Sequence, residues 1–96
     1  MTMQLKDALF NWLQIQVVQD ARPSDRSARD TVQFFEEMLR EDHRVENLEK
    51  RKEKDRYVVC YQVDGEEKEE IFPKDTAEQL LRDIMAEPKY NQVFED

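Results

Sequence analysis

The dipeptide Asp64-Gly65 lies between two runs of residues that favour strands, and it restricts the fold more than any other feature of the chain. Asp-Gly suits a two-residue type I′ turn, because both turn positions need a positive φ. We therefore predict a β-hairpin in which Val63 lies opposite Glu66. Four further pairs follow from this register: Tyr61 with Lys68, Val59 with Glu70, Val58 with Ile71, and Tyr57 with Phe72.

A third strand is expected beside this hairpin, because a lone hairpin is only marginally stable in water. The segment 45–52 fits this role. Its lysines and glutamates are typical of an edge strand that is protected against aggregation. The expected sheet is a three-stranded antiparallel meander.

Apolar residues at helical spacing predict helices on both sides of the sheet in the sequence. The first covers residues 3–18 and is apolar on nearly all sides, which is typical of a helix buried by several neighbours. The second is expected to begin after a cap at Ser27 and to end near Asp42. A short third helix is expected between a cap at Asp75 and Pro88.

This order of elements, α-α-β-β-β-α, predicts an α+β fold with its helices packed mainly on one face of the sheet. A chain of 96 residues has room for one core, so residues 1–88 are expected to form a single compact domain. Residues 89–96 are expected to be a tail that is flexible or loosely docked.

Intrinsic disorder is an alternative, because 40% of the residues are charged. Nine aromatic residues, a single glycine and the periodic apolar segments argue against it. Disordered chains are poor in aromatic residues. We therefore expect a folded protein.

Several features predict a soluble cytoplasmic protein. Cys60 is the only cysteine, so no disulfide can form within the chain. The N-terminus lacks the basic region and cleavage motif of a secretory signal. The longest uncharged stretch, residues 8–19, is shorter than the roughly 20 residues that a membrane span needs.

Residues suited to catalysis or metal binding are few. The only histidine, His43, lies at a predicted helix end, and Cys60 lies in the middle of a strand, where a small buried apolar role is usual. The acids around Asp64-Gly65 lack the spacing of a calcium loop and the burial that a general acid needs. We expect no enzymatic activity, no cofactor and no metal site.

A basic segment, residues 50–56, gives an alternative role in nucleic-acid binding. Its cations would contact phosphates, and two tyrosines would stack on bases, as sheet aromatics do in some RNA-binding proteins. The net charge of −8 argues against this role, since phosphate neutralisation supplies most of such affinity. The residues concerned are Lys50, Lys52 and Arg56, with Tyr57 and Tyr61.

The chain contains more apolar surface than a small sheet with one covered face requires. In the predicted register the central strand is apolar on both faces, although such sheets usually have one polar, solvent-exposed face. Either the fold encloses these side chains, or a partner protein or a second copy covers them. The candidate partner-binding residues are Trp12, Tyr57, Val59, Tyr61 and Val63.

The leading hypothesis is therefore a small, non-enzymatic, cytosolic protein-interaction or regulatory module, which could form a homodimer. Nucleic-acid association is the alternative. A third hypothesis is an acidic decoy that occupies a basic partner, because the chain outside the basic segment carries most of the negative charge.

Overall fold

The computed structural model describes residues 3–86, and the tail predicted at 89–96 lies outside this range. The described residues form the α+β fold predicted from the sequence, with helices first, then strands, then helices. The elements are α1 (Leu5–Ala21), α2 (Arg26–His43), β1 (Val45–Lys52), β2 (Arg56–Val63), β3 (Glu66–Pro73), α3 (Lys74–Ala77) and α4 (Gln79–Ala86).

The three strands form an antiparallel sheet in the order β1-β2-β3. Val63 lies opposite Glu66, and all four further pairs predicted for the hairpin are confirmed. Asp64 and Gly65 have φ values of 52° and 84°, as a type I′ turn requires. The predicted third strand, β1, is also confirmed, but it contains a bulge at Asn47, where φ is 53°.

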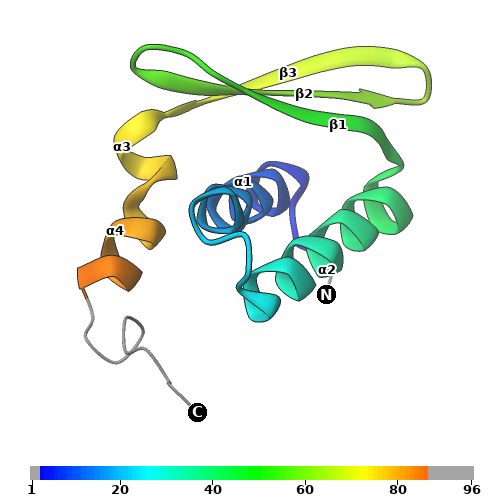
Figure 1. Cartoon of the computed structure of the whole chain (residues 1–96). Helices are drawn as coiled ribbons and strands as arrows, with labels where there is room; N and C mark the ends of the chain where they lie inside the picture. Colours follow the sequence, from blue (N-terminus) through cyan, green and yellow to red (C-terminus); the bar gives the residue numbers. More distant parts are fainter. Residues whose placement is uncertain (1–2, 87–96) are drawn as a thin grey trace.

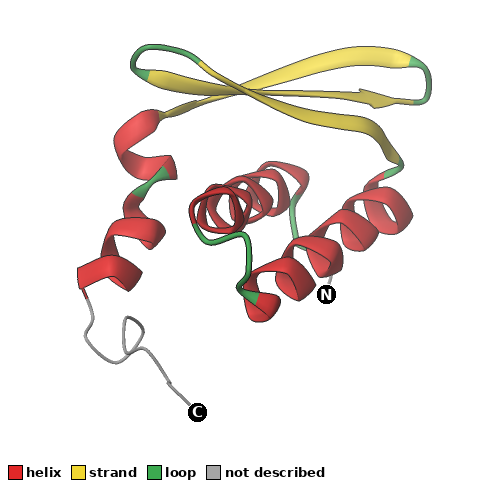
Figure 2. Cartoon of the chain, viewed as in Figure 1, coloured by secondary structure: helices red, strands yellow, loops and turns green. Residues whose placement is uncertain are grey.

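The described helices all lie on one side of the sheet (Figures 1 and 2). Helix α1 lies beneath the sheet, with α2 on one flank and the α3–α4 segment on the other (Figure 1). This arrangement explains why α1 is apolar nearly all round, because it contacts neighbours on three sides. The other face of the sheet is covered by no described helix.

The hydrophobic core lies between α1, α2 and the inner face of the sheet. The aromatic rings of Phe10 on α1 and Phe72 on β3 are 5.3 Å apart. The largest fully buried side chains of the described residues are Leu9, Leu13, Val18, Leu39 and Val59. The core therefore joins both N-terminal helices to the central strand.

Two predicted helix starts are wrong. Helix α2 is capped by Asp25, whose Oδ1 accepts a hydrogen bond from the Ala28 backbone N–H at 3.1 Å, and Ser27 lies inside the helix. The third predicted helix begins immediately after Pro73, without a side-chain cap, and is interrupted at Glu78. The pattern at Ser27 was a plausible cap, but Asp25, two residues earlier, is the residue whose carboxylate accepts a free backbone N–H.

No helix in the described part of the chain has both the length and the apolar character needed to cross a membrane.

Candidate protein-binding surfaces

The inner face of the sheet, which the sequence analysis proposed for a partner, is occupied by the chain's own helices. The exposed fractions of Trp12, Tyr57, Val59 and Tyr61 are 3%, 4%, 0% and 6%. Val63 is half-buried and packs against the same core. The structure brings all five residues together, but it encloses the first four where a partner cannot contact them.

The outer face of the sheet is largely polar, although its central strand is not. Val58 is only 3% exposed, with no described helix above it. Its cross-strand neighbours are Arg51 on β1 and Ile71 on β3, so long side chains of the edge strands cover it. On this face of the sheet, Ile71 is therefore the large apolar residue that stays exposed among the described residues, with an exposed fraction of 54%.

Three cations of the basic segment, Lys50, Lys52 and Arg56, are paired with carboxylates of the chain itself. Lys50 forms an ion pair with Asp20, and Lys52 Nζ lies 3.8 Å from Glu78 Oε2. Arg56 Nε lies 3.2 Å from Asp55 Oδ1. Tyr57 and Tyr61 are buried, so the stacking rings expected for nucleic acid are not on the surface, although the side chains of Lys52 and Arg56 remain 57% and 48% exposed.

Tyr57 instead has a structural role in this region. Its hydroxyl donates a hydrogen bond of 2.7 Å to Glu78 Oε2, which joins the central strand to the α3–α4 segment. Burial raises the pKa of the Tyr57 phenol above its ordinary value, and the Glu78 carboxylate raises it further. Tyr57 therefore stays neutral and serves as a hydrogen-bond donor.

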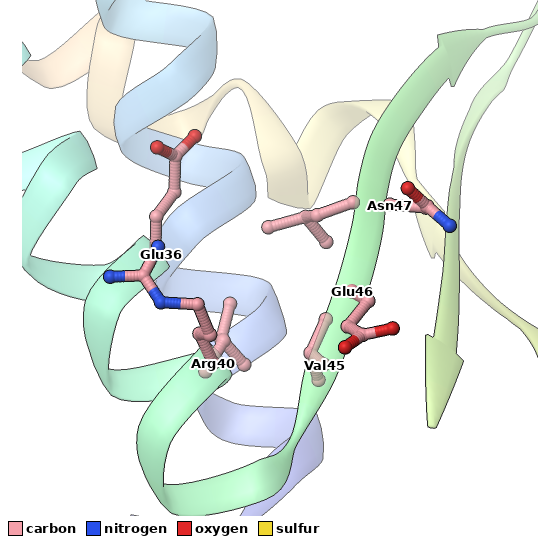
Figure 3. A pocket seen from close by; sticks show the side chains of 7 residues that line it. Glu36, Arg40, Val45, Glu46 and Asn47 are labelled. Carbon is pink, nitrogen blue, oxygen red and sulfur yellow. The ribbon is translucent and has the colours of Figure 1, made fainter. Parts of the chain in front are cut away.

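A groove of about 470 Å³ separates α2 from β1 (Figure 3). Glu36 and Arg40 line it from α2, and Val45 lines it from β1 (Figure 3). At one end, Trp12 Nε1–H donates a hydrogen bond of 3.1 Å to Glu36 Oε2. The rim carries both signs of charge, so it does not favour an ion of either sign.

The two residues best suited to nucleophilic or acid–base chemistry, Cys60 and His43, form contacts with other parts of the chain. Cys60 Sγ lies 3.7 Å from Glu69 Oε2, and burial, followed by the Glu69 charge, raises the pKa of the thiol. This disfavours the reactive thiolate. His43 Nε2 lies 2.8 Å from the Met3 carbonyl oxygen. The residues described here include no group of three or more side chains placed to hold a metal ion.

The outward face of α2 carries an apolar and acidic row, which we call the α2 stripe. Its members recur at spacings of three and four residues and so lie on one side of the helix. Phe34, at its centre, is 58% exposed and has its ring 5.3 Å from that of Phe35, which packs against the core. The stripe consists of Asp30, Phe34, Glu37, Met38, Glu41 and Asp42.

The carboxylates of the α2 stripe have a different environment from those of Asp20 and Glu78. Among the described residues, no ion pair is formed by Asp30, Glu37, Glu41 or Asp42. By contrast, Asp20 and Glu78 are paired with lysines. The stripe therefore presents negative charge that the described part of the chain does not neutralise.

Sequence reasoning missed this surface because it placed Phe34 at the edge of the core-facing row of α2. The same placement of Met38 is correct, since Met38 packs against the core. The signal was the adjacent pair Phe34-Phe35. Neighbouring residues on a helix are about 100° apart, so when Phe35 points into the core, Phe34 lies at the margin of the buried face. Whether a residue at that margin is exposed depends on neighbours that the sequence does not show.

Comparisons of the chain with protein-family models, with curated proteins and with solved structures find no match.

Proposed function

We propose that this protein is a non-enzymatic interaction module that binds a partner protein through the α2 stripe. The observation that carries the proposal is the exposed ring of Phe34 among carboxylates that have no ion-pair partner in the described chain. Exposed apolar patches with a polar rim are typical of protein-binding sites, and aromatic residues dominate their affinity.

The other surfaces support binding less well. The inner sheet face is filled by α1, and the outer face carries one exposed large apolar residue, Ile71, among charged neighbours. A nucleic-acid role has less support, because the tyrosines are buried and the cations are paired.

Cytoplasmic location is part of the proposal, since the single cysteine suits a reducing compartment.

Photo-crosslinking in the cells that naturally express the chain tests this proposal. A photoreactive phenylalanine analogue replaces Phe34, and in a control variant it replaces Ile71, which is almost equally exposed. We expect a discrete covalent adduct from position 34 alone, and competition by excess unlabelled protein. No adduct from position 34, or the same adducts from both positions, would contradict the proposal.

A further inference from the structure

We infer that the partner segment that binds the α2 stripe is a basic amphipathic helix of another protein. The inference rests on the proposed function and specifies the chemistry of the partner. It follows from the shape of the stripe and from its charge, which are separate observations.

The shape of the stripe favours a helical partner. Phe34 and Met38 are one helical turn apart and form a short apolar ridge along α2. Phe34 is its exposed part, because Met38 is half-buried and also packs against the core. A shallow hollow follows this ridge, lined by α2 residues alone. A partner helix can pack an apolar row of its own along such a ridge, because rows at spacings of three and four residues interdigitate.

The charge of the stripe favours a basic partner. Four carboxylates flank the apolar ridge, and no Lys or Arg belongs to the stripe. Of the cations near Glu37, Glu41 and Asp42, Arg40 lines the groove next to β1 (Figure 3) and Arg44 lies 3.7 Å from Asp64. Arg26 and Arg29 lie near Asp30, at the other end of the helix. Complementary charge accelerates association and excludes unsuitable partners.

The same charge disfavours two other classes of macromolecule. Nucleic acids and anionic lipid surfaces are both attracted by lysine and arginine, and the stripe would repel them. The net charge of −8 acts in the same direction over the whole molecule. A basic protein segment is the occupant that fits both the apolar ridge and the carboxylates that flank it.

Titration calorimetry and NMR with a synthetic peptide test the inference. The probe is an 18-residue helix of lysine and leucine, with leucines on one face, and the controls are a scrambled Lys/Leu peptide and a Glu/Leu helix. We expect the basic amphipathic helix to bind at a ratio of one to one and to shift amide resonances of the α2 stripe. Neither control peptide should do so, and equal binding of the scrambled peptide would overturn the inference.

Two matched pairs of charge reversals separate the stripe from the overall charge. Glu37→Lys with Glu41→Lys changes the stripe, whereas Glu66→Lys with Glu67→Lys makes the same change in net charge at the hairpin turn. We expect the first pair to weaken peptide binding about tenfold and the second less than about twofold at 150 mM salt. Equal weakening by both pairs would overturn the inference.

A substitution at the apolar ridge completes the test. Phe34→Ser should weaken binding of the peptide about tenfold, as loss of a central aromatic anchor does. Phe34 is exposed, so the variant should keep its native circular dichroism spectrum. An unchanged affinity would overturn the inference.

Other occupants of the stripe give different results. A dimer that Phe34→Ser converts to a monomer in light scattering would make a second copy the occupant and overturn the inference. A contact by NMR between the Phe34 ring and residues 87–96 in the free protein would do the same for the chain's own C-terminal segment. If the cellular adduct at position 34 forms but the basic peptide does not bind, the inference fails and the proposed function stands.

Discussion

Tyr57 shows how one side chain determines the position of a whole segment. It extends from β2, is 4% exposed, and its hydroxyl donates a hydrogen bond to the Glu78 carboxylate. Glu78 lies between α3 and α4, where the helical segment after Pro73 is interrupted. Lys52 approaches the same carboxylate oxygen at 3.8 Å. A hydrogen bond to a charged acceptor contributes more to stability than one between neutral groups.

Replacement of Tyr57 by phenylalanine removes this bond and keeps the ring. We expect the free energy of unfolding at pH 7 to fall by about 1.5 kcal/mol, the lower end of the range for hydrogen bonds to charged groups, because Glu78 is partly exposed. Urea denaturation measures the change. Tyr61→Phe is the control, and it should cost less, since the described residues show no hydrogen bond from the Tyr61 hydroxyl. Equal losses for the two variants would contradict the expectation.

The Tyr57 phenol also predicts how stability depends on alkaline pH. Its pKa is raised in the folded protein, whereas in the unfolded chain it ionises near pH 10. The unfolded state therefore releases its proton first, and the stability present below pH 10 is lost as the pH rises further. The unfolding free energy of the natural protein should fall more steeply between pH 9 and 11 than that of Tyr57→Phe. Parallel profiles would contradict this explanation.

Gly65, the single glycine of the sequence, has a backbone conformation that favours glycine. Its φ is 84°, and a Cβ built at this position meets no atom within 4 Å, so a substitution acts through backbone strain alone. We expect Gly65→Ala to reduce the unfolding free energy by about 1 kcal/mol. Gly65→Asn should cost clearly less, because asparagine tolerates a positive φ. Urea denaturation of both variants checks this, and an Asn variant as unstable as the Ala variant would contradict it.

At the level of whole elements, the residue that caps the N-terminus of α2 is Asp25 in the structure, whereas the sequence pattern suggested Ser27. Asp25→Ala removes the carboxylate that accepts the Ala28 N–H, and we expect a loss of about 1 kcal/mol. Ser27→Ala, at the cap that the sequence suggested, should change stability by less than about 0.5 kcal/mol. Thermal unfolding followed by circular dichroism compares the two. A larger loss of stability for Ser27→Ala than for Asp25→Ala would contradict the assignment of Asp25 as the cap.

The strands were more predictable than the helix ends, for a physical reason. The side-chain period of a strand is two, and the turn at Asp64-Gly65 determines the register of the hairpin, so the pairs on β2 and β3 follow without tertiary information. Helix ends depend on which of several polar residues meets a free N–H. Asn47 at the bulge and Glu78 at the interruption form side-chain hydrogen bonds with the distant residues Gln62 and Tyr57, which a local sequence pattern does not show.

For the molecule as a whole, the sequence indicated the amount of apolar surface correctly but not its location. A count of apolar residues on each face could not show that α1 has neighbours on three sides, or that Arg51 and Ile71 cover Val58. The candidate surface on α2 followed only from the exposure of Phe34. Its acidic residues were visible in the sequence, but their lack of ion-pair partners was not.

The open edges of the sheet lead to a prediction about the oligomeric state. In the hairpin, Val63 and Glu66 flank a two-residue turn and bond to each other, so the backbone groups of Glu67 and Glu69 point away from β2, along the free edge of β3. Charged side chains on an edge strand hinder pairing with another sheet. The glutamates of β3 should therefore keep the protein monomeric.

Replacing Glu67 and Glu69 with valine should remove this protection. Valine favours the strand conformation and carries no charge, so the double variant should associate through β3 at concentrations where the natural protein is a monomer. Sedimentation equilibrium from 10 µM to about 1 mM measures the difference. Lysine at both positions is the control, since it restores charge of the opposite sign and should keep the chain monomeric. A monomeric valine variant over this whole range would show that the charge of these two glutamates does not protect the edge.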